Sequence, residues 1–215
     1  MPIQMQGNSG TAVEVDGTTF RAMRITPRPV DVGALGAYQL AMVTGTMAAG
    51  LAANAEIFQF RYAGTATCVV HKVILDGVGS IAAFTAGVAT FRGITARSYT
   101  ANGSGGTAGT LTGNNAKQRT SHATTALGDF RIASTAALTA GTRTLDAQGF
   151  GQVVGAFSAT AGTMIDEGVI LDTYGGNQHP LVLAQNEGFV IQATVPATGT
   201  WTTGITVAWS EVTSY

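Results

Sequence analysis

The chain contains three histidines, the side chains best suited to acid–base catalysis or metal binding near neutral pH. His71, His122 and His179 lie far apart, and no pair has the short spacing of a local zinc motif. Ser121 precedes His122, but the nucleophile and base of a catalytic triad must meet in space, not in sequence. We therefore expect no catalytic histidine and no metal site, unless the fold assembles ligands from distant segments. His71 lies in an apolar run, and we expect it to face outward from a strand.

Carboxylates and one glycine-rich segment could also carry chemistry. Asp166 and Glu167 are adjacent, so on a strand they would point to opposite faces and could not act together. Glycoside hydrolysis would need Glu167 or Asp172 to face another carboxylate across a cleft. Residues 103–108, GSGGTA, match the dinucleotide-binding pattern G-x-G-x-x-A, but a glycine- and threonine-rich stretch follows where that motif needs a helix. We expect no catalytic residue and no cofactor.

The single cysteine and the two tryptophans are interpreted as structural residues. Cys68 cannot form an internal disulfide, and its apolar neighbours predict a buried, inert thiol. Trp209 alternates with Val207 and Ile205, which places it in the core of a sheet. Trp201 follows a Gly-Thr pair and is expected at the edge of a turn. There it would stack on a sugar or pack at a seam between subunits.

The composition indicates a protein that functions against other protein surfaces. Charged residues make up 11% of the 215 residues, whereas about 25% is usual in globular proteins. The net charge of −1 gives no electrostatic case for a nucleic-acid partner. No apolar run approaches the roughly 18 residues of a membrane span, and the N-terminal sequence lacks the features of a signal peptide. We expect synthesis in a cytoplasm and no membrane partner.

The elements that must position these side chains are predicted to be β-strands. Turn residues separate eight to ten apolar segments of period two, and no crossover helix is evident, although residues 47–56 and 164–168 could each form a helical turn or two. The sequence therefore predicts an all-β, antiparallel β-sandwich, in the form of a jelly roll, over residues 33–215. The pattern lapses over a long Gly/Thr-rich loop at 98–129. The predicted strands cover residues 38–44, 57–62, 68–75, 88–96, 130–133, 142–145, 152–157 and 169–173, and two or three more lie between 181 and 209.

Residues 1–32 are predicted to form an N-terminal arm. Two strand-like stretches, 11–15 and 20–25, flank an Asp-Gly turn signal, and Pro27 and Pro29 then interrupt any ladder. An isolated hairpin is marginally stable, so the arm must lie against another surface. Either it attaches the protein to a partner, or its apolar residues complete the core of the same subunit. The side chains expected to contact a partner are Gln4, Gln6, Asn8, Arg21, Arg24 and Arg28.

Three stretches carry a resemblance to a known class of protein. They are MPIQMQGNSGTAVEVDGTTFRAMRITPRP, FRIASTAALTAGTRTLDAQGFGQVVG and PLVLAQNEGFVIQATVPATGTWTTGITVAWSEV. They resemble virion structural proteins of tailed bacteriophages, and in particular small jelly-roll proteins that decorate or cement phage heads or build tail tips and fibres. The resemblance implies a non-enzymatic protein of the virion, assembled as a homotrimer and bound to the major capsid protein or other virion proteins.

Three functional hypotheses follow. The first is a capsid decoration or cement protein whose sandwich forms the trimer and whose arm reaches onto neighbours. The second is a tail-tip, fibre or spike protein in which the loop at 98–129 contacts the host. The third is a carbohydrate-active or cupin-like enzyme on the same fold, which requires a cleft with converging histidines or carboxylates, or a bound metal.

Overall fold

The alternating apolar segments form β-strands in the computed structural model, which describes residues 35–174 and 179–213. These residues contain twelve strands and no α-helix, so the predicted all-β class is confirmed. In chain order the strands are β1 (Gly36–Val43), β2 (Ala55–Tyr62), β3 (Thr67–Ala82), β4 (Gly87–Ala101), β5 (Thr107–Ala108), β6 (Leu127–Ile132), β7 (Thr142–Phe157), β8 (Met164–Ile165), β9 (Gly168–Asp172), β10 (Leu181–Leu183), β11 (Glu187–Thr194) and β12 (Thr200–Val212).

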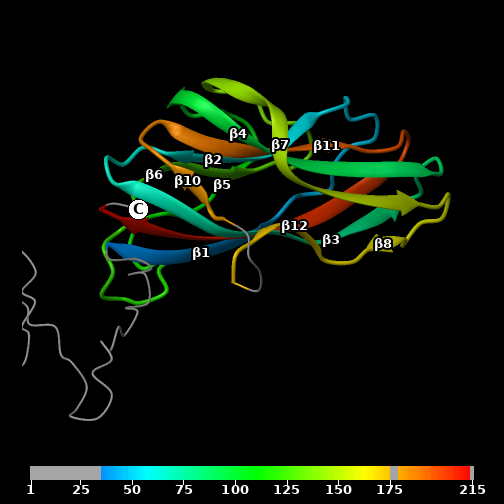
Figure 1. Ribbon diagram of the computed structural model, residues 1–215. Coiled ribbons are helices and arrows are strands. Elements are labelled where there is room, and N and C mark those ends of the chain that lie inside the picture. The colour runs from blue at the N-terminus through cyan, green and yellow to red at the C-terminus, as the bar shows by residue number, and fades with distance from the viewer. Residues whose placement is uncertain (1–34, 175–178, 214–215) are drawn as a thin grey trace, which may run out of the picture. The chain divides into compact units, whose positions relative to one another are not determined.

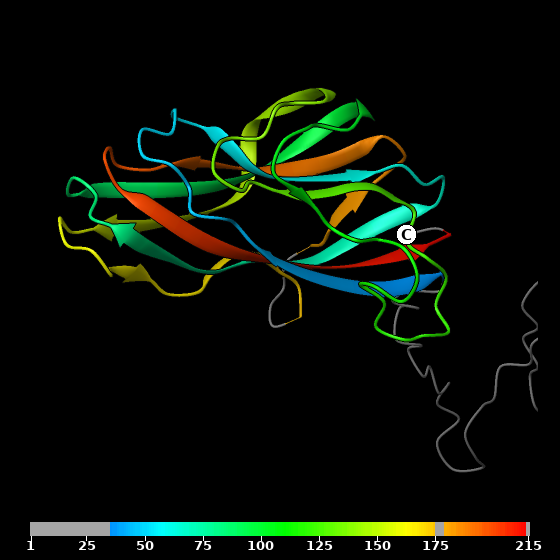
Figure 2. The ribbon, with the colours of Figure 1, turned by 180° about the vertical axis from the view of Figure 1, so that it is seen from behind.

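The strands form two antiparallel sheets that pack face to face, as the two opposite views show (Figure 1 and Figure 2). The first, here the β1 sheet, has the order β1-β12-β3-β10, and β9 and β8 continue along the same edge of β3 as β10. The second, here the β2 sheet, has the order β5-β6-β2-β11-β4-β7. The predicted antiparallel β-sandwich is therefore confirmed.

The connectivity is that of one long hairpin wound on itself. β1 pairs with β12, β2 with β11, β3 with β9 and β10, and β4 with β7. Winding the hairpin alternates its strands between the sheets, which also brings β12 beside β3 and β11 beside β4. This nested pairing is the strand order of a jelly roll.

The core lies between the sheets and is rich in aromatic rings. Phe60 of β2 stacks on Phe189 of β11 at 4.8 Å between ring centroids, and Trp209 of β12 meets Phe60 edge-on at 5.5 Å. Trp209 is therefore a core residue, as predicted. Trp201 is fully buried as well and packs edge-on against Phe91 at 5.7 Å. The prediction of a turn-edge Trp201 for sugar or subunit contact is wrong, because β12 begins before it and turns its ring inward.

Several predicted boundaries differ from the structure. β7 is one strand of 16 residues where two were predicted, and residues 164–168 begin with β8 rather than a helical turn. Residues 47–56 also contain no helix. The predicted loop at 98–129 is shorter, since β4 continues to Ala101, β5 pairs with β6, and β6 begins at Leu127. The predicted arm of residues 1–32 lies outside the described residues, together with Gln4, Gln6, Asn8, Arg21, Arg24 and Arg28.

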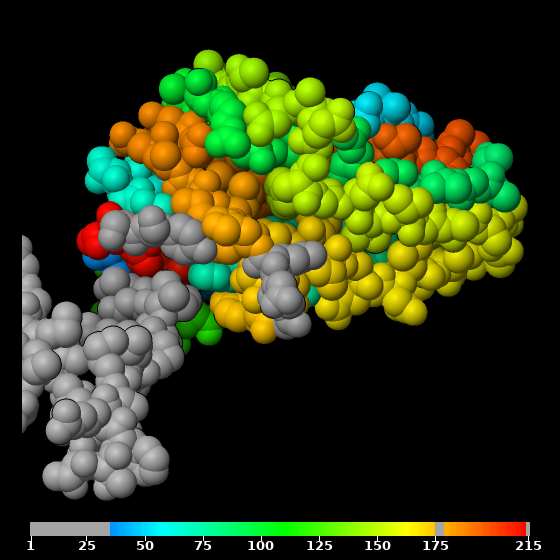
Figure 3. All heavy atoms as spheres, in the orientation of Figure 1, coloured from blue at the N-terminus to red at the C-terminus, as the bar shows by residue number. Residues whose placement is uncertain are grey.

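One side of the sandwich is closed by tight backbone packing between β7 and β9. A Cβ atom added to Gly151 of β7 would lie 2.1 Å from the carbonyl oxygen of Ile170. One added to Gly168 of β9 would lie 2.5 Å from a methyl carbon of Val153. Figure 3 shows β7 in yellow-green and β8 and β9 in yellow as one continuous surface. Glycine at these positions allows the two sheets to meet.

We expect Gly151→Ala to lower the free energy of unfolding by about 1–3 kcal/mol, because the added methyl group must displace the backbone of β9. Gly79→Ala is the matched control: its Cβ would meet nothing within 4 Å, and the expected change is within about 0.5 kcal/mol. Urea unfolding measures both variants. Equal effects would show that the β7–β9 contact does not constrain the fold.

Candidate functional site

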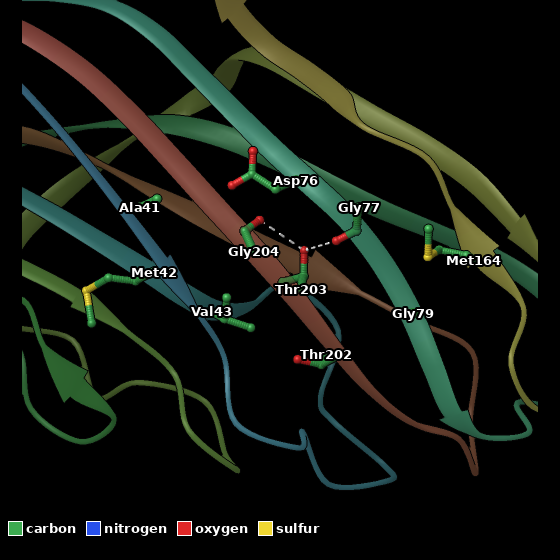
Figure 4. Close-up of a pocket in the computed structure, with 10 residues that line it drawn as sticks. All are labelled: Ala41, Met42, Val43, Asp76, Gly77, Gly79, Met164, Thr202, Thr203 and Gly204. Atoms are coloured by element: carbon green, nitrogen blue, oxygen red, sulfur yellow. Dashed lines mark hydrogen bonds between the residues drawn. The ribbon is translucent and has the colours of Figure 1, made fainter.

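The outer face of the β1 sheet carries a shallow groove of about 360 Å³ between β1 and β8 (Figure 4). Four strands build it, with β12 and β3 lying between β1 and β8. Most of its floor consists of glycine and threonine, and its two sides end in exposed apolar side chains. The lining residues are Ala41, Met42, Val43, Asp76, Gly77, Gly79, Met164, Thr202, Thr203 and Gly204.

The backbone along the groove has a fixed arrangement. Thr203 donates its hydroxyl hydrogen to the carbonyl oxygen of Gly77 at 2.8 Å and lies 3.3 Å from that of Gly204 (Figure 4). Gly77 has a φ of 90°, which favours glycine. The register between β3 and β12 shifts here, next to Thr203. The floor of the groove here consists of glycine and threonine and carries no large side chain.

The groove offers apolar contact rather than ionic chemistry. Val43 and Met164, on its two sides, are each 67% exposed. Asp76 is the one ionisable residue among the ten that line it, and its carboxylate accepts a hydrogen bond of 2.6 Å from the hydroxyl of Thr206. Small residues let another chain approach the backbone closely, and the flanking side chains would be buried by that approach. These features are typical of a surface for protein contact.

The structure places the three histidines in separate environments. His71 was predicted to face outward from its strand, but its side chain is buried. It lies at a bulge of β3, where its Nε2 and Ser210 Oγ share a hydrogen bond of 2.8 Å and its ring centroid lies 5.5 Å from that of Tyr174. His122 Nδ1 accepts a hydrogen bond of 3.1 Å from the amide of Ala37 and so ties the segment before β6 to β1. His179 lies at a turn, with Nδ1 2.7 Å from the carbonyl oxygen of Pro180.

The other sequence candidates are also apart. Asp166 and Glu167 occupy the turn between β8 and β9, and residues 103–108 form a turn and the short β5. Within residues 35–174 and 179–213, no three His, Cys, Asp or Glu side chains come together as a metal site. The same residues contain no helix that could cross a membrane.

A buried carboxylate holds the long connection at one end of the sandwich. Glu211 of β12 is 4% exposed and accepts hydrogen bonds from the hydroxyl of Thr125 at 2.6 Å and the amide of Ala126 at 2.9 Å. Burial raises the pKa of Glu211 above its ordinary value of 4.5 in spite of these bonds. Cys68 is fully buried, as predicted, and burial together with the Glu211 charge raises its thiol pKa, which keeps the thiol protonated. This cluster belongs to the interior of the subunit.

A second buried charge lies on the outer side of the β2 sheet. Arg143 of β7 pairs with Glu56 of β2, and their side chains are 2% and 12% exposed. The guanidinium carbon lies 4.7 Å from the centroid of the Tyr99 ring, and Gln59 donates to Glu56 at 2.8 Å. Among the described residues, Nε and Nη1 of Arg143 have no hydrogen-bond partner. The pair therefore links β7 to β2, and its arginine also contacts β4 through Tyr99.

Neither the groove nor the two buried clusters was predicted from the sequence. Arg143 follows a stretch of alanines and threonines, and nothing local marks its partner 87 residues away. The groove depends on the register of β3 and β12, which the local pattern does not contain. Glu211 alternates with Trp209, and that spacing was a usable signal that its carboxylate faces inward.

Comparison of this chain with models of protein families, with curated proteins and with solved structures gives no match. The site is therefore interpreted from its own geometry.

We expect Arg143→Met to lower the free energy of unfolding by about 3–5 kcal/mol, because it leaves the Glu56 carboxylate buried without its partner. Arg97→Met is the control. Arg97 pairs with Asp146 and Glu187 at the surface, with its own side chain 45% exposed, and the expected loss is below about 1 kcal/mol. Urea unfolding compares the two. A loss at Arg143 no larger than at Arg97 would contradict a structural role for the buried pair.

We expect stability to decrease in mild acid because of His71. Burial lowers the pKa of His71 below its ordinary 6.5, so the unfolded chain takes up a proton more readily than the folded chain. The contribution of His71 is therefore present in full above pH 6.5 and is lost as the pH falls from 6.5 towards the folded pKa. His71→Gln should flatten the pH dependence of the urea midpoint in this window. Glu211, whose pKa is raised, changes stability in the opposite sense, so Glu211→Gln should not remove the decrease.

Proposed function

We propose that this chain is a structural protein of a tailed-bacteriophage virion, a jelly-roll subunit that associates with copies of itself and decorates or cements the capsid. In this proposal it is not an enzyme. It holds protein surfaces together and acts as a homotrimer on the major capsid protein, with residues 1–32 as the segment of attachment. Synthesis takes place in the cytoplasm of the host.

The groove on the outer face of the β1 sheet is the observation that carries this proposal. Its walls, Val43 and Met164, are exposed apolar side chains, and its glycine-rich floor allows close approach of another backbone. A second copy of the chain would bury both walls, and Asp76, the one ionisable residue of the lining, would keep its hydrogen bond from the Thr206 hydroxyl. A symmetric oligomer uses such a patch once in every subunit.

The charge distribution supports the same function. Only 11% of residues are charged, and the described buried charges, such as Arg143 with Glu56, are engaged inside the subunit. A weakly charged surface gives copies little mutual repulsion. The jelly-roll topology and the resemblance of three sequence stretches to virion structural proteins of tailed bacteriophages add to this support, while the particular neighbour on the virion remains part of the proposal.

Light scattering of the full chain tests self-association, and we expect one stable oligomer at low micromolar concentration. Met164→Asp should dissociate it, because it places a charge in the apolar wall. The control is Val88→Asp on the β2 sheet, a site that is 59% exposed and lies outside the groove, and it should leave the oligomer intact. A folded monomer at every concentration would refute the proposed assembly.

Binding to virions that lack the native protein tests attachment. We expect the full chain to rebind in a copy number typical of a head protein, far above that of a tail component. A copy number typical of a tail component would instead indicate a tail-tip or fibre protein. Failure to bind either structure would contradict a role on the virion.

A further inference from the structure

On the edge of β1 that faces away from β12, the backbone groups are paired over only the first half of the strand. The amide of Gln39 donates to the carbonyl oxygen of Ala116 at 2.7 Å, and the amide of Gln118 donates to the carbonyl oxygen of Ala37 at 2.9 Å. The segment before β6 therefore covers the first half of this edge (Figure 2 shows β1 in blue, with the green segment at one of its ends). It covers that half with the hydrogen bonds of a short strand.

The second half of the same edge is open. Backbone groups alternate in direction along a strand, so the N–H and C=O groups of Ala41 and Val43 point to the same side as those of Gln39. Among the described residues they have no hydrogen-bond partner. The side chains of Leu40 and Met42 on the inner face are half-buried there, against the core. A strand beside Ala41 and Val43 would pair these groups and cover both side chains.

β1 carries none of the devices that keep an edge strand from pairing. Its sequence, GAYQLAMV, contains no charged residue and no proline, and its register with β12 is unbroken by a bulge. Soluble proteins normally protect such edges with lysine, proline, bulges or a covering segment, because an open ladder recruits other strands. Here the covering segment stops at Gln39. An uncharged edge that continues beyond its cover is suited to receive a strand.

We propose that the open edge of β1, from Ala41 to Val43, receives residues 11–15 of a second copy of this chain as an added strand. This proposal rests on the proposed self-assembly and names its contact. The sequence TAVEV alternates, so Val13 and Val15 would extend the apolar inner face next to Leu40 and Met42, and Glu14 would point outward. Backbone pairing supplies affinity in this mode of recognition, and alternate side chains supply specificity.

The length of the preceding chain allows the exchange. Residues 16–35 separate this strand from β1, and these 20 residues can span up to about 66 Å when extended. The amide of Leu35 is bonded to the carbonyl oxygen of Glu211, so the chain enters β1 at its covered half. The open half is the one farther from that entry. In an exchange between identical copies, each subunit both donates residues 11–15 and receives them, so the same contact is repeated in every subunit.

Disulfide trapping in the full chain tests the exchange. Glu14→Cys is combined with Ala41→Cys or with Val43→Cys, which lie on the outward face of β1, and a mild oxidant is added. A disulfide requires Cα atoms about 4.4–6.8 Å apart, so it reports pairing of the two strands. We expect covalent oligomers on a non-reducing gel. Cys68 is fully buried and does not take part. In the control, Val13→Cys with Ala41→Cys, the thiols face opposite sides and should link at least tenfold less.

A second pair of variants tests the backbone contact. In the Glu14→Cys, Val43→Cys chain, Ala41→Pro removes an N–H group that makes no bond among the described residues, so the pairing with β12 is retained. We expect it to reduce the linked product about tenfold, while Ala41→Val, which keeps the N–H, retains it. Circular dichroism melting confirms that both variants fold.

The outcomes separate this inference from the proposed function. Covalent oligomers that Ala41→Pro abolishes support the exchange. A disulfide formed within one chain, or no disulfide, overturns it. If light scattering still shows the oligomer in that case, self-assembly through the groove stands and only the exchanged strand is wrong.

Discussion

The pairing of the last strand with both β1 and β3 is the contact on which the rest of the structure depends. β12 lies between the first strand and the third, so it joins two parts of the chain that would otherwise share no ladder. Its inner face supplies Trp201, Ile205, Val207 and Trp209 to the core. Its outer face forms the middle of the groove. Because the bonds of β12 link the two ends of the chain, the β1 sheet can close only after the whole sequence is in place.

The two sides of the sandwich differ in a way that follows from this winding. On one side β7 meets β9 closely, with Gly151 against the backbone of Ile170 and Gly168 against the side chain of Val153. On the other side the sheets end in β1 and the two-residue β5, and the connection between β4 and β6 fills part of the gap. Glu211 fixes the end of that connection through Thr125 and Ala126, and the buried Arg143–Glu56 pair links β7 to β2.

Much of the fold could be predicted from the sequence because a sheet with one buried face imposes a period of two. The strands around Ile57, Phe189 and Val207 were found in this way. The strand order could not be predicted, since sandwiches of different topology share the same local pattern. β7 was predicted as two strands because it lies at the exposed edge of its sheet. Few of its side chains are buried, so its sequence lacks a continuous alternation of apolar residues. The burial of His71 was missed because Thr173 and Tyr174, which follow β9, cover its ring, and nothing in the sequence around His71 indicates this cover.

The groove and the open half of β1 belong to one sheet, and both follow from the same shortage of charge. A charged residue at Ala41 or Val43 would protect the edge, and a large one at Gly204 would fill the groove, yet each position carries a small or apolar residue. In a free monomer such a surface favours aggregation, because open edges and apolar patches bind other chains. In a subunit that is packed against copies of itself, the same surface allows close contact. The residues that break the usual rules for a soluble surface are therefore gathered on the face that the proposed assembly would bury, while on the opposite side of the same sandwich β7 and β9 pack closely through glycine.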